Sequence, residues 1–202
     1  MANTNAPFGF TQRQGTGSAP TYEQTTFGID YNAAVIYYGD PVVRVGTGDG
    51  TIKQAAGSAG GSTVTMAGVF YGCKYLSTSQ KRTVWNNYWP GSDVTVGNQS
   101  TIEAYVVNDP AAQFLVQSDS TGVALADVGA NNDFNIGAGT ASNGLSGAFL
   151  IHGGATGAAY PFRLIGLVTN PPGAPGTASG AYNYAVVAFN NVETKNATAI
   201  NT

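Results

Sequence analysis

Charge is the scarcest property of this 202-residue sequence. Asp, Glu, Lys and Arg make up 9% of its residues, against roughly a quarter in ordinary soluble proteins. The 8 basic residues are dispersed, and their densest run is Lys74, Lys81 and Arg82. Nucleic-acid binding needs several Lys or Arg side chains that neutralise neighbouring phosphates, so we expect no nucleic-acid partner. A monomer normally keeps a charged surface for solubility, so a chain this poor in charge is expected to assemble with partners.

Cysteine, histidine and long hydrophobic runs are also scarce. The single Cys73 excludes an internal disulfide, and the single His152 excludes a metal site built from several histidines. The longest apolar runs, such as 147–151, are far shorter than the ~20 residues that span a bilayer. The N-terminus shows neither the basic nor the apolar region of a signal peptide. We therefore expect synthesis in the cytoplasm, no membrane partner and no cofactor.

Glycine and turn signals are abundant instead. The chain has 28 Gly and 9 Pro, which argues against a helix bundle and favours many short strands joined by tight turns. The slip in alternation near Ala67-Gly68 predicts a β-bulge, and 121–132 predicts one short helical turn. The predicted strands cover 22–29, 33–38, 42–45, 51–55, 62–76, 93–96, 101–107, 113–117, 143–151, 162–169 and 182–190.

Such a run of short strands predicts an all-β fold, an antiparallel β-sandwich or barrel with at most one short helix. The first twenty residues show no periodicity, which predicts an extended N-terminal arm over 1–20 ahead of a single β domain over 21–202. Residues 77–92 hold both tryptophans and are expected to form an aromatic excursion from this domain.

The sequence offers few residues for catalysis. A serine triad would need His152 beside a serine such as Ser146 and a carboxylate such as Asp133, and no Gly-x-Ser-x-Gly motif accompanies them. We interpret His152 as a turn histidine and Cys73 as a core residue of a strand. The chain is therefore not expected to be an enzyme.

Acidic residues allow two further interpretations. Asp93 and Glu103 offer a carboxylate pair of the kind that glycosidases use, but most acids of this chain sit at turns, where Asp hydrogen-bonds the local backbone. The segment 127–133 gathers several oxygen ligands without the spacing of a calcium loop. We expect turns at these places and no metal site.

The aromatic side chains of the excursion leave three interpretations open. Tyr75, Trp85, Tyr88 and Trp89 are close in sequence and have polar neighbours. The loop can fold back so that its tryptophans complete the core, the aromatics can anchor a protein interface, or they can stack on sugars.

Several short segments resemble a known family. They are Met1-Ala2-Asn3, Ala6-Pro7-Phe8-Gly9-Phe10, Tyr38-Gly39-Asp40-Pro41-Val42, 108–117, 127–131 and 163–168. In this order they resemble the capsid cement, or decoration, proteins of tailed bacteriophages.

The resemblance implies a β-sandwich, often jelly-roll-like, that binds the outside of the phage head across the seams between capsomers. Its partners would be the major capsid protein and further copies of itself, in a homodimer or homotrimer. The protein would be made in the host cytoplasm and reside on the exterior of the virion capsid. A tail or baseplate component and a glycan-binding virion module are the alternatives. The predicted contact residues are Pro7, Phe8, Phe10, Arg13, Trp85, Tyr88 and Trp89.

Overall fold

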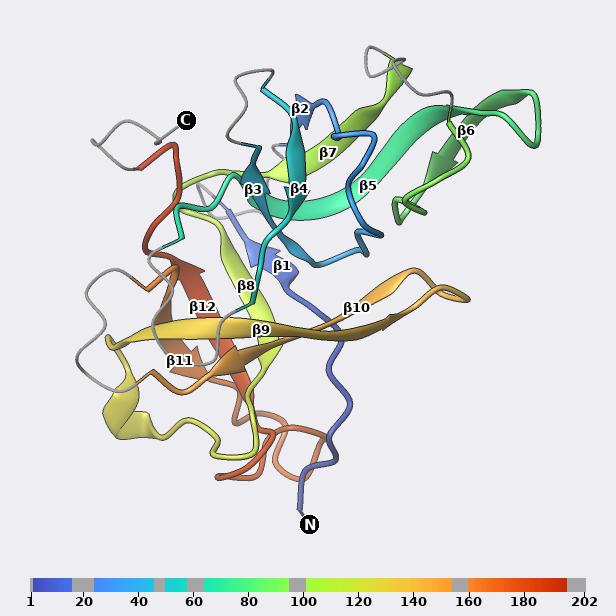
Figure 1. The fold of residues 1–202 in the computed structure, drawn as a ribbon. Helices are drawn as coiled ribbons and strands as arrows, with labels where there is room; N and C mark the ends of the chain where they lie inside the picture. Colours follow the sequence, from blue (N-terminus) through green and yellow to red (C-terminus); the bar gives the residue numbers. More distant parts are fainter. Residues whose placement is uncertain are drawn as a thin grey trace.

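Two antiparallel β-sheets make up the fold (Figure 1). The computed structural model describes residues 2–15, 24–45, 50–57, 64–94, 101–153 and 160–195. The first sheet has the order β1-β8-β12-β11-β9-β10, and the second has the order β2-β7-β5-β3-β4, with β6 paired to β5. The predicted all-β fold of the sandwich or barrel type is confirmed.

The strands of the first sheet are β1 (Thr11–Gln14), β8 (Gln113–Gln117), β9 (Asn131–Thr140), β10 (Leu145–Ile151), β11 (Phe162–Leu167) and β12 (Tyr184–Phe189). Those of the second are β2 (Thr25–Phe27), β3 (Pro41–Arg44), β4 (Ile52–Gln54), β5 (Gly68–Ser77), β6 (Arg82–Asn86) and β7 (Glu103–Val107). A single 3-10 turn, η2 (Leu125–Asp127), is present in the described residues. The predicted strand 113–117 coincides with β8.

Strand β9 was not predicted, because a short helical turn was expected over 121–132. The strand contains Asn, Gly, Ala and Thr with Phe134 and Ile136 as its large apolar residues. Its place in the sheet is fixed by pairing: Phe134 lies opposite Leu150 of β10, and Asn132 lies opposite Phe162 of β11. The helical turn itself is three residues long and ends before β9 begins.

The predicted strand 33–38 is not a strand of either sheet; the segment makes isolated bridges at Ile36 and Tyr38. Residues 93 and 94 are likewise outside any strand, and residues 95 and 96 lie outside the described residues. Strand β6, in contrast, occupies part of the expected excursion over 77–92 and forms a hairpin with β5.

A β-bulge occurs in β5, but later than predicted. The register against β7 shifts between Phe70 and Gly72 rather than near Ala67-Gly68. The inserted residue changes which side chains face which way, as bulges do. Beyond it, Cys73 and Tyr75 join Phe70 in the same hydrophobic cluster.

Each face of the second sheet carries its own hydrophobic cluster. Val69 and Val107 face the first sheet and pack with its buried residues, including Phe114 and Phe162. The opposite face of the second sheet is covered by Ile36 and Trp89 from the segments that cross it. Two cores therefore share β5 and β7.

Four residues of the predicted N-terminal arm are part of the first sheet. Residues Thr11–Gln14 form β1, which pairs with β8. The side chain of Gln117 holds the preceding residues, since its Oε1 accepts the Ala6 N–H (2.9 Å) and its Nε2 donates to the Thr4 carbonyl (2.9 Å). Residues 2–15 are therefore packed rather than free; residue 1 and residues 16–20 of the predicted arm lie outside the described residues.

A buried carboxylate joins three parts of the chain. Asp40 accepts hydrogen bonds from the Ser146 hydroxyl of β10 (2.5 Å), the Gln54 amide of β4 (2.7 Å) and the Tyr37 N–H (2.7 Å). The adjacent Gly39 carbonyl accepts the Phe10 N–H (2.9 Å). Both sheets and the N-terminal segment meet at this residue.

Replacing Ser146 by Ala is expected to lower the free energy of unfolding by about 1–3 kcal/mol, because a buried acceptor loses a donor. Burial already raises the pKa of Asp40, and the three hydrogen bonds oppose that shift. When the pKa of a carboxyl group is higher in the folded chain than in the unfolded chain, the free energy of unfolding falls as the pH rises from the unfolded-state pKa through the folded-state pKa. Losing the Ser146 donor raises that folded pKa further, so the loss should be larger near pH 7 than near pH 4.

Urea unfolding at both pH values measures this difference. Ser120→Ala, at an exposed serine, is the matched control and should leave the stability within about 0.5 kcal/mol. An equal loss at both pH values would contradict the assigned role of Asp40.

Candidate functional site

Two of the seven predicted contact residues are buried and cannot meet a partner in this fold. Phe10 has no exposed surface and stacks on Phe162, with ring centroids 4.3 Å apart. Trp89 has none either: Tyr75 packs edge-on against it at 5.4 Å. The structure thereby corrects the expectation for these two side chains, which complete the two cores.

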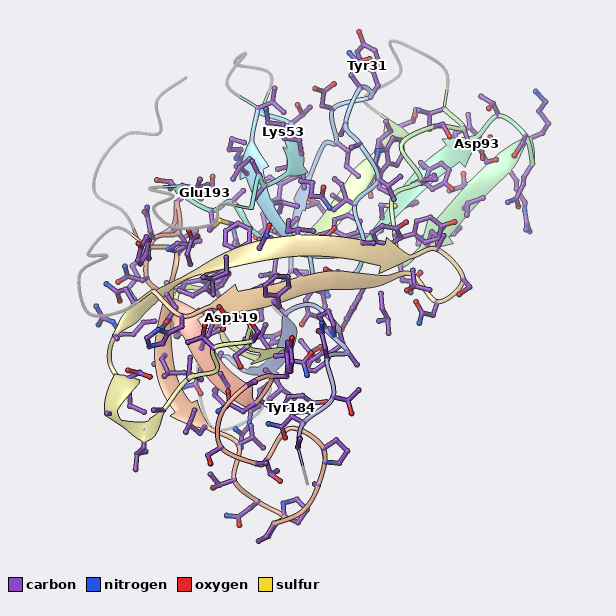
Figure 2. The ribbon with its side chains drawn as sticks, turned by 60° about the horizontal axis from the view of Figure 1, so that its bottom comes forward. Tyr31, Lys53, Asp93, Asp119, Tyr184 and Glu193 are labelled. Atoms are coloured by element: carbon purple, nitrogen blue, oxygen red, sulfur yellow. The ribbon has the colours of Figure 1, made fainter. Side chains whose placement is uncertain are left out.

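Three more of the predicted residues are half-buried, and two of these have aromatic partners within the chain. Phe8 packs edge-on against Tyr184 at 5.2 Å, and Tyr88 stacks on Tyr37 at 5.7 Å. Tyr184, the partner of Phe8, lies far from the β5–β6 end of the molecule, which the labelled Asp93 marks in Figure 2. Pro7 precedes Phe8 in the packed N-terminal segment.

The remaining two, Arg13 and Trp85, are exposed. Arg13 belongs to β1 of the first sheet and Trp85 to β6 of the second. The structure therefore does not gather the predicted contact residues into one surface.

Trp85 lies on an exposed extension of the second sheet. Its side chain is 67% exposed. The strand register places it directly opposite Lys74 of β5, and Lys74 directly opposite Glu103 of β7. Directly paired residues point to the same face of a sheet, so the three side chains form a row across three strands.

The neighbouring positions of this face complete the platform. Tyr105, two residues after Glu103, lies opposite Gly72, where a Cβ would lie 3.0 Å from the Asn86 carbonyl oxygen. On the other side of the row, Leu76 is exposed and lies opposite Thr83. We call Trp85, Lys74, Glu103 and Tyr105 the Trp85 platform.

The charges of the Trp85 platform are paired. Lys74 Nζ lies 2.8 Å from Glu103 Oε2. The hydrogen bond to Glu103 raises the pKa of Lys74, and the nearby Tyr105 adds to this shift. The platform thus presents one ammonium group and one carboxylate beside an exposed indole.

A second exposed apolar surface lies on η2 and the adjacent part of β11. Leu125 is 77% exposed, and Val128 and Ile165 are also exposed. Reciprocal backbone hydrogen bonds attach this turn to β11: Gly129 N–H donates to the Leu164 carbonyl (2.9 Å), and Leu164 N–H donates to the Ala130 carbonyl (2.9 Å). We call Leu125, Val128 and Ile165 the η2 patch.

An open cavity of about 440 Å³ adjoins the η2 patch. Val123, Leu125 and Leu167 supply its apolar lining, and the side chains of His152 and Asp127 lie in its wall. His152 Nε2 is 3.2 Å from Asp127 Oδ2. The hydrogen bond from the Ala124 N–H lowers the pKa of Asp127, and the contact with His152 lowers it further.

These contacts bear on the histidine as predicted from sequence. His152 directly follows β10 and precedes Gly153, and no signal in the sequence predicted its contact with Asp127. The hydroxyl of Ser146 is donated to Asp40, and Asp133 is buried in β9. The serine triad that the sequence made conceivable is not assembled from these residues.

The acidic residues considered above also have local partners. Asp93 accepts hydrogen bonds from Ser77, Thr78 and Ser79, which lower its pKa to about 2. Its conceivable catalytic partner Glu103 is paired with Lys74. Within the described ranges, no group of three or more His, Cys, Asp or Glu side chains is placed to hold a metal ion.

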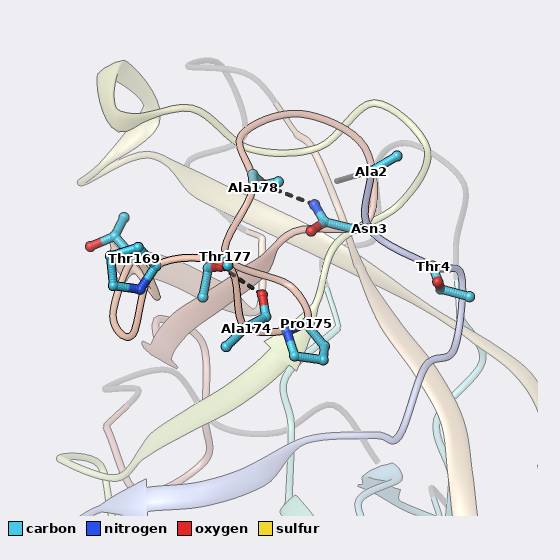
Figure 3. Close-up of a pocket in the computed structure, with 10 residues that line it drawn as sticks. Ala2, Asn3, Thr4, Thr169, Ala174, Pro175, Thr177 and Ala178 are labelled. Carbon is cyan, nitrogen blue, oxygen red and sulfur yellow. Dashed lines mark hydrogen bonds between the residues drawn. The ribbon is translucent and has the colours of Figure 1, made fainter.

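The N-terminal segment forms one wall of another cavity (Figure 3). This cavity, of about 430 Å³, lies between residues 2–4 and the Pro-rich loop. Asn3 Nδ2 donates to the carbonyls of Ala178 (2.8 Å) and Ala181 (3.0 Å). These bonds attach the N-terminal segment to the loop, and the cavity wall has no charged side chain.

Comparisons with protein-family models, curated proteins and solved structures gave no match to this chain. In the part of the chain that the structure describes, no helix is long and apolar enough to span a membrane.

Cys73 is expected to be unreactive in the native protein. Its side chain is buried, and burial raises the pKa of its thiol to about 12, so the reactive thiolate is scarce at neutral pH. An aromatic disulfide reagent should modify the chain in denaturant and leave it unmodified in buffer. Reaction of the native protein at the rate of the unfolded one would contradict this.

Proposed function

We propose that this protein is a virion structural protein, a capsid cement or decoration protein that binds the outer surface of a phage head through the η2 patch. The observation that carries the proposal is the exposure of Leu125, Val128 and Ile165 beside an apolar-lined cavity. Buried apolar side chains seated in pockets dominate the binding energy of protein interfaces.

The cavity gives this surface the shape that a protein partner needs. An apolar side chain of a capsid subunit can enter between Val123 and Leu167, while Leu125 covers it from the rim. The carboxylate in the wall has partners within the chain, since Asp127 accepts a hydrogen bond from the Ala124 N–H (2.7 Å) and contacts His152 Nε2 (3.2 Å). Covering the cavity therefore leaves the carboxylate of Asp127 with its partners.

Two further features support a structural role. The chain carries little charge, as expected of a protein that shares much of its surface with partners. Many copies on one shell also gain avidity from modest contacts, and a ligand that binds the expanded shell stabilises it by mass action. Docking by the η2 patch would give each copy one such modest contact, and many bound copies would together stabilise the expanded shell.

The proposal also fixes an orientation. The β5–β6 hairpin lies at the opposite end of the molecule from η2 in both Figure 1 and Figure 2. A copy docked by the η2 patch therefore directs the Trp85 platform away from the shell. Arg13 remains exposed on β1 and is available for contact with a neighbouring copy.

The double variant Leu125→Ser, Ile165→Ser is expected to bind poorly to shells that lack the protein. Each truncation removes exposed apolar surface that the contact would bury, and the combined loss should weaken binding at least ~tenfold. Purified protein is titrated onto undecorated shells of the phage that encodes it, and bound copies are counted against the major capsid protein.

The matched control is Trp85→Ala, which removes a larger exposed side chain at the other end and should leave occupancy unchanged. Both variants change exposed positions, so their stabilities should stay within about 0.5 kcal/mol of the parent protein. Saturation of the double variant at the parent's concentration would refute docking by the η2 patch, and failure of the parent protein to bind would refute the cement function itself.

A further inference from the structure

The Trp85 platform has the composition of a ligand site rather than of a protein interface. Its exposed indole lies next to the Lys74–Glu103 ion pair in the same row of side chains. Lys and Glu are depleted from the centres of protein interfaces, because burying such a pair under another protein costs desolvation of both charges. Trp85 cannot be covered by a flat partner surface without covering this pair as well.

We propose that the Trp85 platform binds the sugar rings of a neutral polysaccharide. The C–H face of a pyranose is apolar and flat, and it fits the exposed face of an indole. The hydroxyl groups around the ring donate and accept hydrogen bonds, so they can replace water at both members of the ion pair.

The geometry of the pair suits this ligand. Lys74 Nζ and Glu103 Oε2 are 2.8 Å apart, a separation comparable to that of two adjacent hydroxyl oxygens on a pyranose. One hydroxyl can donate to the carboxylate while its neighbour accepts from the ammonium group. Because the two charges balance, the platform favours a neutral sugar over an acidic one.

The strand spacing gives the platform room for an extended ligand. Neighbouring strands lie ~4.8 Å apart, so the row from Trp85 to Glu103 spans about two strand spacings. Along the same face, the half-buried Tyr105 lies opposite Gly72, which has no side chain of its own. A polysaccharide can therefore stack one ring on Trp85 and continue over Gly72 toward Tyr105.

The two tryptophans provide the measurement. Trp85 is exposed and Trp89 is buried, so a ligand on the platform changes the fluorescence of Trp85 and leaves that of Trp89 as a constant background. The probes are soluble oligosaccharides of β-linked glucose, α-linked glucose, N-acetylglucosamine and mannose, each titrated by fluorescence and by calorimetry.

At least one probe should bind saturably and shift the emission to shorter wavelength. Trp85→Ala should weaken that binding by about tenfold or more and abolish the spectral shift, because the stacking surface is lost. Glu103→Gln, which keeps the shape but removes the carboxylate, should weaken it by a smaller factor. Leu125→Ser, at the opposite end, is the control and should bind the sugar as the parent protein does.

Two results of the sugar titrations would overturn the assignment: no saturable binding of any probe, or binding that survives Trp85→Ala unchanged. If, in addition, Trp85→Ala lost occupancy in the shell experiment described above, the Trp85 platform would be a protein contact instead. The inference is independent of the cement function, since sugar titrations contain no shells and the η2 variants leave the platform intact.

Discussion

The buried Asp40 carboxylate is the interaction on which the arrangement of the two sheets depends. Its oxygens accept hydrogen bonds from one side chain of each sheet and from a local backbone N–H. An unpartnered carboxylate at this depth would be costly, so the sheets, and the N-terminal segment bonded to Gly39, are held in one relative position. Gly9 and Gly39 make this possible, because a Cβ on Gly9 would lie 2.7 Å from the Ser146 Cβ.

From this junction, the bulge in β5 decides which residues reach solvent. Before it, Val69 faces the core between the sheets; after it, Cys73 and Tyr75 face the second core. Lys74 and Leu76 consequently continue the face that meets the first sheet, at a place where they are not covered by it. The exposed row that includes Trp85 is therefore a consequence of one inserted residue.

The sequence predicted the fold class and several strands, among them β8, whose residues alternate between half-buried and buried over most of its length. It did not predict β9, whose Asn and Gly residues have low strand propensity and whose pairing with β10 and β11 is a tertiary effect. For the candidate site, the sequence predicted that Trp85 and Trp89 are neighbours in one aromatic excursion. Their fates differ because Trp85 faces outward in β6 while Trp89 bridges back to Ile36 under the second sheet, and local sequence contains no signal for that choice.

The distribution of exposed apolar residues follows from the same architecture. Clusters of exposed apolar residues mark places where a protein associates with other molecules. The fold separates two such clusters, one on η2 beside a cavity and one beside an ion pair on the β5–β6 extension. The first offers apolar depth and the second offers a flat ring with paired charges. Under the two proposals, a protein side chain enters the former and a hydroxylated ring stacks on the latter, and the two contacts do not compete because they lie at opposite ends of the molecule.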